Sequence, residues 1–170
     1  MAIVATVGSG SSFKPAPSGL HQGVCVDVVD MGVLEVTYAG QTKRQHKVRV
    51  VWQIDQDMES GKPFIVQKRY TLSLHEKATL RKELESWRGR VFTDEELAGF
   101  DLEKLLGANA QLNIQHANKN GEIYANVVSI VPLGRGMQKI EARGYVRVQD
   151  RTDINGQTDP EPLTVEDIPF

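Results

Sequence analysis

KRQHKVRVVWQID, residues 43–55, has the clearest strand pattern in the chain. Its even positions from Val48 to Ile54 are apolar, whereas its odd positions from Lys43 to Gln53 are mostly basic or polar. Because successive side chains of a strand point to opposite faces, this pattern predicts one apolar face and one basic to polar face. We therefore expect a sheet that buries one side of this segment.

Strand patterns also lie on both sides of this segment. FIVQKRYTLSL, residues 64–74, follows the turn-rich residues 57–63, so a hairpin is expected. Upstream, residues 20–41 are rich in β-branched and apolar residues and are interrupted at Met31 and Gly32. This pattern predicts either one long strand with a bulge or two short strands.

A helical segment is predicted after these strands. Leu80, Leu84 and Trp87 recur at the spacing of one helix face, which favours a core position for Trp87. SLHE at residues 73–76 predicts a capping box at the start of this helix, and Gly89 is a suitable stop.

Two shorter helical turns and a second hairpin complete the pattern. TDEE, residues 93–96, predicts another capping box, and FDLEKLLG, residues 100–107, predicts a further turn or two of helix. Residues 108–117 alternate apolar and polar side chains, and NKNG at 118–121 is a hairpin turn. Residues 122–133 predict a final strand that stops at a proline.

The predicted fold class is mainly β, a β-barrel with inserted helices. Three strands, a helical segment and two strands follow the order of the OB-fold, a barrel of about five strands, although other small folds share this order. We expect the OB-fold at residues 20–133 and a flexible arm, rich in Gly, Ser and Pro, at residues 1–19. Residues 134–149 are expected to be a linker or an extra edge strand, and residues 150–170 a disordered acidic tail.

Charge is distributed unevenly along the chain. The formal net charge is −2, but residues 150–170 hold six of the 22 acids and one of the 20 basic residues. This leaves 19 basic and 16 acidic residues in residues 1–149, a net charge of +3, against −5 in the tail. A mildly basic body is a suitable partner for nucleic acid, and the like charges of the tail keep it extended.

The sequence does not indicate a membrane, secreted or metal-dependent protein. It lacks an apolar run of the ~20 residues that cross a bilayer, and residues 1–13 lack the basic start of a signal peptide. The single cysteine, Cys25, fits a cytoplasmic location. The four histidines are scattered, and we find no catalytic, cofactor or metal-ligand pattern, so we expect no enzyme, no cofactor and no metal.

The last residues, VEDIPF, resemble a known family. Their resemblance to the acidic C-terminal tip of bacterial single-stranded DNA-binding proteins (SSBs) rests on Glu166, Asp167, Ile168, Pro169 and Phe170. The resemblance implies that this tip recruits host or phage replication, recombination and repair proteins. The residue types suit that role, because Phe170 can enter an apolar pocket while its carboxylate meets an Arg or Lys.

A looser resemblance covers residues 20–133. The segment YTLSLHEKATLRKELESWRGRVFTDEELAGFDLEKLLG, residues 70–107, is similar to phage-encoded proteins of the SSB type. The resemblance implies single-stranded DNA as the ligand, and a phage or prophage protein in a bacterial cytoplasm. SSBs include assemblies of several subunits as well as monomers and dimers, so a homo-oligomer remains one of the open alternatives.

Binding of single strands without sequence preference needs cations for the phosphates and aromatic faces for the bases. The predicted DNA-binding residues are Lys43, Lys47, Arg49, Trp52, Lys68, Arg69, Tyr70 and Tyr124. Trp52 shares a face with apolar neighbours, so it either stacks a base or fills the core, and Tyr70 is similarly ambiguous. Tyr38 could also stack a base, and basic residues beyond the last strand, such as Arg143 and Arg147, could extend the basic track.

Two other functions stay open. In the first, the protein is an interaction adaptor whose body binds protein and whose tip docks on a repair or replication enzyme. In the second, it is a metal-dependent nuclease, for which the closeness of Asp27 and Asp30 is weak support. Salt-sensitive affinity for single strands would separate an SSB from the adaptor, and loss of a substrate strand on adding magnesium would indicate the nuclease.

Overall fold

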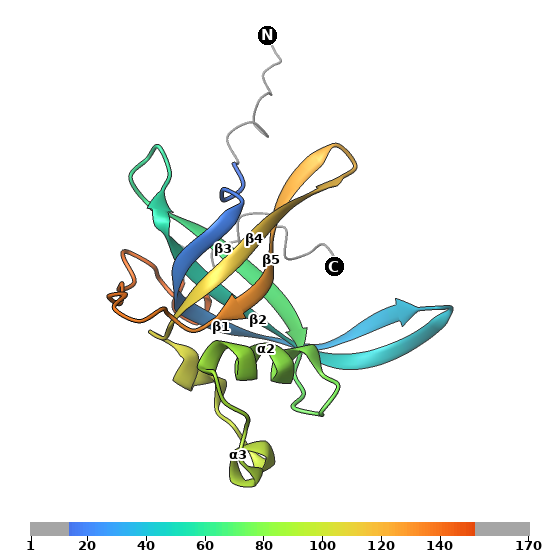
Figure 1. Cartoon of the computed structure of the whole chain (residues 1–170). Coiled ribbons are helices and arrows are strands. Elements are labelled where there is room, and N and C mark those ends of the chain that lie inside the picture. The colour runs from blue at the N-terminus through green and yellow to red at the C-terminus, as the bar shows by residue number, and fades with distance from the viewer. Residues whose placement is uncertain (1–13, 152–170) are drawn as a thin grey trace.

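The computed structural model describes residues 14–151, which fold mainly as β-strands (Figure 1). In chain order the elements are β1 (Gly19–Tyr38), β2 (Gln41–Asp57), β3 (Pro63–Thr71), α2 (Thr79–Arg88), α3 (Asp94–Ala98), the 3₁₀ helix η1 (Leu102–Leu105), β4 (Asn109–Lys119), β5 (Glu122–Val131) and the 3₁₀ helix η2 (Val148–Asp150). The predicted order of three strands, a helical segment and two strands is confirmed.

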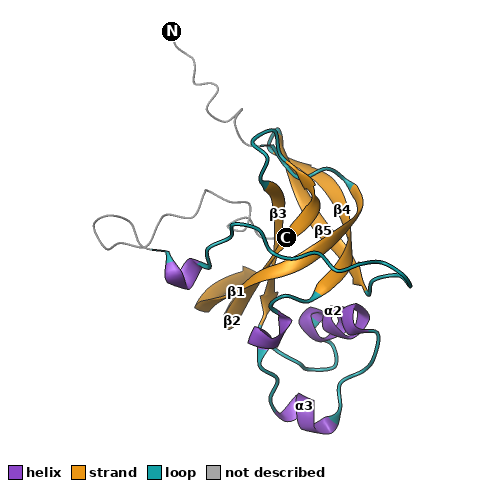
Figure 2. Ribbon diagram, turned by 90° about the vertical axis from the view of Figure 1, so that its left-hand side faces the viewer, coloured by secondary structure: helices purple, strands orange, loops and turns teal. Residues whose placement is uncertain are grey.

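The strands form a single antiparallel sheet in the order β3-β2-β1-β4-β5. β1 pairs with β4 along its first residues and with β2 along most of its length, so it joins the two halves of the sheet. The sheet curls until its edge strands approach each other (Figure 2). At this approach the Lys68 Nζ on β3 donates to the Val127 carbonyl on β5 at 3.1 Å.

β1 is one continuous strand with two irregularities, which agrees with the first of the two sequence predictions. Its register against β2 shifts between Cys25 and Asp27 and again between Asp30 and Gly32. Gly32 has a φ of 74°, which favours glycine, and its N–H donates to Asp30 Oδ1 at 2.8 Å. Beyond this bulge, β1 and β2 continue as a two-stranded ribbon that projects from the body and ends at Tyr38 (Figure 1).

The core lies inside the curled sheet. Val48, Val50, Trp52 and Ile54, the even positions of β2, are all buried in it, as the alternation predicted. Helix α2 packs against one end of the core, where the ring centroids of Trp87 and Trp52 lie 5.8 Å apart. The predicted core position of Trp87 is confirmed.

The start of α2 differs from the prediction, whereas its end agrees with it. The N-cap is Ala78, which makes no side-chain hydrogen bond, so the capping box at residues 73–76 is wrong. The Ser73 hydroxyl instead accepts from the His75 N–H at 3.1 Å. This bond belongs to a local turn that precedes the helix, so the hydroxyl does not cap α2. Gly89 closes the helix in the left-handed conformation, with a φ of 76°.

The later helical predictions are confirmed. Thr93 and Glu96 form a capping box in front of α3 with both reciprocal hydrogen bonds present. Residues 100–107 contain η1, and Gly107 follows it with a φ of 82°. No helix within residues 14–151 is long and apolar enough to cross a membrane.

The described part of the N-terminal arm, residues 14–18, is packed rather than loose. Ala16 is 3% exposed and belongs to the core. Its carbonyl oxygen lies 2.7 Å from His116 Nε2, within hydrogen-bond distance. Lys14 forms an ion pair with Glu59 at 3.0 Å, which ties the arm to the β2–β3 turn.

Residues 139–151, which we call the strap, cross the outer face of the sheet, the face of β1, β2 and β3 that points away from the core. The strap contains no β-strand, so within the described residues the structure does not have the extra edge strand that was one of the two alternatives for residues 134–149. Its backbone bonds to side chains instead: the Gln53 amide exchanges two hydrogen bonds with the Arg143 backbone, at 2.8 and 2.7 Å. Ile140 and Tyr145 of the strap pack against a smaller buried cluster, Val24, Val26 and Val51.

Candidate nucleic-acid interface

Four of the predicted cations share the outer face. Alternation along β2 places Lys43, Lys47 and Arg49 on this face, because the even positions from Val48 to Ile54 point into the core. Arg69 on β3 is the direct cross-strand partner of Arg49, and Lys47 Nζ donates to Thr71 Oγ1 at 2.9 Å. We call Lys43, Lys47, Arg49 and Arg69 the basic row.

The members of the basic row differ in their surroundings. Lys43 is exposed on the ribbon, whereas Arg49 is only 4% exposed. Burial, and secondly the nearby Arg69 guanidinium, lowers the pKa of Lys47. Like charges held this close raise the local positive potential, which favours the approach of an anion.

Lys68 and Tyr70 lie on the opposite side of β3 from the basic row. Lys68 Nζ donates to Glu83 Oε2 and the Tyr70 hydroxyl donates to Glu83 Oε1, both at 2.6 Å. Tyr70 is 4% exposed, and its burial, followed by the negative charge of Glu83, raises the pKa of Tyr70 well above its usual range. These side chains fasten α2 to β3, so the structure does not bring Lys68 and Tyr70 together with the other predicted DNA-binding cations.

The two remaining predicted aromatic residues do not join the basic row either. Trp52 is 0% exposed, so the core alternative applies to it and its ring is closed to a ligand. Tyr124 lies on β5, separated from β2 by β1 and β4. Its hydroxyl donates to Glu122 Oε2 at 2.8 Å, and this hydrogen bond raises the pKa of Tyr124.

Two other tyrosines lie at opposite ends of the outer face. Tyr38, at the tip of the ribbon, is 83% exposed and lines a shallow hollow together with Lys43. Tyr145, on the strap, has the Arg151 guanidinium 5.2 Å from its ring centroid. The sequence indicated Tyr38 as a candidate for stacking but gave Tyr145 no role, because the strap was expected to be a linker or an edge strand.

Acids of the outer face are paired with arginines of the strap. Asp27 is 1% exposed and accepts hydrogen bonds from Arg147 Nε at 3.0 Å and from the Tyr145 hydroxyl at 2.9 Å. Asp57, at the end of β2, forms an ion pair with Arg143. Arg143 and Arg147 were predicted to extend the basic track, and they reach this face as partners of the two carboxylates. The pairing reduces the repulsion that these acids would exert on a polyanion.

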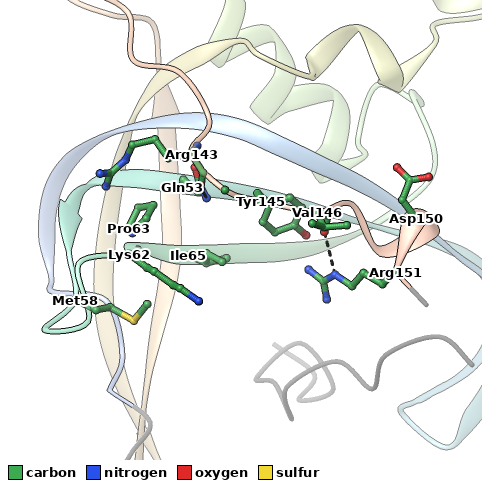
Figure 3. A pocket seen from close by; sticks show the side chains of 11 residues that line it. Gln53, Met58, Lys62, Pro63, Ile65, Arg143, Tyr145, Val146, Asp150 and Arg151 are labelled. Carbon is green, nitrogen blue, oxygen red and sulfur yellow. Dashed lines mark hydrogen bonds between the residues drawn. The ribbon is translucent and has the colours of Figure 1, made fainter. Parts of the chain in front are cut away.

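A pocket of about 500 Å³ lies at the strap end of the outer face (Figure 3). Met58, Lys62 and Ile65 line it from the β2–β3 hairpin, and Tyr145 and Arg151 line it from the strap. Its volume falls within the range of pockets that hold small ligands, ~300–1,000 Å³. Sequence reasoning missed this pocket, because its two walls lie about 80 residues apart in the chain and meet only when the strap docks.

Within residues 14–151, no three histidine, cysteine or carboxylate side chains come together as a metal site would require. The two carboxylates behind the nuclease alternative have other partners. Asp27 binds the strap, and Asp30 Oδ1 lies 2.6 Å from His46 Nε2. That hydrogen bond and the one from the Gly32 N–H, the larger cause, lower the pKa of Asp30.

The predicted tail lies outside the described residues except for Asp150 and Arg151, and so does the whole tip, Glu166–Phe170. The chain matches no protein-family model and no curated protein.

Proposed function

We propose that this protein binds single-stranded DNA without catalysis and with little sequence preference. The observation that carries the proposal is the basic row on the outer face, of which Lys43, Lys47 and Arg69 are exposed or half-buried, beside acids that are already paired with strap arginines. Cations spaced along one face neutralise phosphates and release their counterions whatever the bases are. Such a surface therefore favours a polyanion over a small charged ligand.

We also propose that the curled sheet is an OB-fold barrel. The strand order, the helical segment between β3 and β4, and the approach of β3 to β5 support this assignment. OB-folds bind oligonucleotides on the face of strands 2 and 3 and with the neighbouring loops. The basic row lies on β2 and β3, and Tyr38 is the last residue of β1, next to the turn that joins β1 to β2.

Exposed aromatic surface favours single strands over duplex. Tyr38 is 83% exposed near Lys43, so a base can stack on its ring while the lysine meets a phosphate. Each stacked base contributes ~1–3 kcal/mol by alanine substitution, and a duplex keeps its base faces covered. The proposed ligand is therefore a strand whose bases are free.

The proposed partners follow from the resemblance of the tip. We propose a phage or prophage SSB of the bacterial cytoplasm that protects single strands during replication, recombination or repair, while Glu166–Phe170 recruit partner proteins. Deleting these residues is expected to leave DNA affinity intact or raised and to abolish copurification of those partners. A shortened protein that retains the same partners would contradict this role.

The first test is fluorescence anisotropy of a labelled poly-dT oligonucleotide, titrated with the full chain at low and moderate salt. We expect tight binding that weakens steeply as salt rises, because phosphate contacts release counterions. A matched unlabelled duplex is expected to compete poorly. Absence of binding at low salt would overturn the proposed function.

One observation favours the adaptor alternative. A groove of about 530 Å³ beside α2 has an aromatic lining that includes Trp87, Phe92 and Phe100. Arg90 and Lys104 add positive charge to it. An acidic peptide with apolar side chains matches this chemistry. The same titration separates the two functions, since the adaptor requires no salt-sensitive affinity for single strands.

A further inference from the structure

We infer that the pocket between the β2–β3 turn and the strap holds a nucleobase of the bound strand. This inference rests on the proposed binding of single-stranded DNA and assigns to it a base subsite. Figure 3 shows the two sides: Met58 and Lys62 project from the turn, and Tyr145 and Arg151 belong to the strap.

The pocket continues the basic row along β3. Arg69, Gln67 and Ile65 are alternate residues of this strand, so all three face outward; Arg69 pairs with Arg49 and Ile65 with Gln53. At the strand rise of ~3.3 Å per residue, Ile65 lies ~13 Å from Arg69. A strand held by its phosphates on the basic row therefore reaches the pocket within a few nucleotides.

The lining of the pocket suits a base and its adjoining phosphate. Ile65 is 44% exposed and, with the polarisable thioether of Met58, offers apolar contact on one side. On the other side Arg151 and Tyr145 form a cation–π pair, and both guanidinium and aromatic planes are surfaces on which bases stack. Lys62 is exposed beside them, where its ammonium can meet a phosphate.

The strap side of the pocket is held in place by bonds that do not involve a ligand. The Gln53 side chain donates to the Arg143 carbonyl at 2.8 Å and accepts from the Arg143 N–H at 2.7 Å. Next along the strap, the Tyr145 hydroxyl donates to Asp27 at 2.9 Å. A wall fixed in advance lowers the ordering cost of binding, which is the condition that a specific subsite needs.

Two matched substitutions test the inference without disturbing the strap. Ile65→Asp places a charge in the pocket, whereas Val128→Asp makes a similar change on β5, where the side chain is 43% exposed compared with 44% for Ile65. We expect Ile65→Asp to weaken poly-dT binding by about tenfold or more, the effect of losing one stacked base and repelling its phosphate. Val128→Asp is expected to bind as the wild type does.

A second measurement locates the base directly. An oligonucleotide with 5-iododeoxyuridine, irradiated on the full chain, is expected to crosslink to peptides that contain Met58 or Tyr145. Equal affinity of the two variants, or crosslinks confined to other peptides, would overturn the subsite while leaving the proposed function intact. A wild-type protein that binds no single strand would overturn both.

Discussion

Arg147 and Asp27 lie 120 residues apart in the sequence and form an ion pair, with 3.0 Å between Arg147 Nε and Asp27 Oδ1. Asp27 is 1% exposed, so its charge is compensated by the strap, whose Tyr145 hydroxyl and Val148 N–H also donate to it, both at 2.9 Å. Arg147 in turn contacts Glu103 at 2.8 Å, and chiefly this hydrogen bond raises the pKa of Arg147. One arginine thus joins the strap, β1 and η1.

Replacing Arg147 tests how strongly the strap stabilises the fold. Arg147→Ala leaves the buried Asp27 carboxylate without its cation, a change that typically costs about 3–5 kcal/mol. We expect the free energy of unfolding in urea to fall by an amount of this order. Arg135→Ala, an exposed position before the strap, is the control and is expected to change stability by less than ~0.5 kcal/mol. Equal stability of the two variants would show that the strap is not anchored through this pair.

Charge reversal tests the basic row. Lys43→Glu combined with Lys47→Glu is expected to weaken binding to all single-stranded sequences alike. If each lysine meets one phosphate, the slope of log affinity against log salt becomes shallower by about 1.4, since each contact contributes ~0.7 for single strands. The matched control is Lys77→Glu with Lys82→Glu, which makes the same change in net charge at exposed positions near α2. Equal losses in both double variants would show that net charge, rather than the row, governs binding.

The buried thiol gives a test of the core in solution. Burial is the largest cause that raises the pKa of Cys25, from its ordinary value of 9.0 to about 12. The native protein is therefore expected to react with a thiol reagent at pH 8 at least ~100-fold more slowly than the protein in urea, because only opened molecules react. Comparable rates would contradict the buried position.

The same shift has a consequence for stability. Because the folded pKa of Cys25 lies above the unfolded value, the stability linked to this group is fully present below about pH 9. This stability is lost as the pH rises from about 9 toward about 12. In this range the Cys25 thiol of the unfolded chain has lost its proton, whereas the thiol of the folded chain still holds it. Cys25→Ala is expected to remove this part of the alkaline loss of stability.

Close packing at Gly23 predicts a large effect from one methyl group. A Cβ at this position would lie 2.7 Å from Leu112 Cδ1 and 3.3 Å from the Gln53 carbonyl oxygen. Leu112 is 0% exposed and cannot move aside, so Gly23→Ala is expected to cost about 1–3 kcal/mol. Gly99→Ala is the control, because its Cβ would meet nothing within 4 Å and its φ of 177° suits any residue. Thermal unfolding measures both.

The alternation of β2 was sufficient to predict both of its faces. Val48 and Trp52 lie in the core, and Lys47 and Arg49 lie outside, because side-chain direction in a strand is a local property. On β3 the same reasoning did not identify the exposed face. Lys68 faces inward because its ammonium donates a hydrogen bond to the Glu83 carboxylate on α2. That contact depends on how the helix packs against the sheet.

The strap could not be predicted because its contacts are distant in sequence. Gln53 and Arg143 are 90 residues apart, and no local pattern shows that a glutamine amide will replace a neighbouring strand. A partial signal was present in the alternation of YVRV, residues 145–148. Tyr145 and Arg147 both donate to the Asp27 carboxylate, and these side-chain bonds take the place of the backbone ladder that a strand would form.

The two parts of β1, one in the sheet and one in the ribbon, differ in local stability. Among the described residues, no third strand pairs with residues 33–45, whereas Val28 lies in the sheet between β2 and the strap. An isolated two-stranded hairpin is only marginally stable in water, so backbone hydrogen bonds open more readily toward Tyr38 than at Val28. Amide exchange should therefore quicken along this one strand from body to tip. One strand, β1, therefore has a rigid part within the sheet and a more mobile part in the ribbon. In the proposed function, Tyr38 at the tip could follow the motion of a bound DNA strand without disturbing the core.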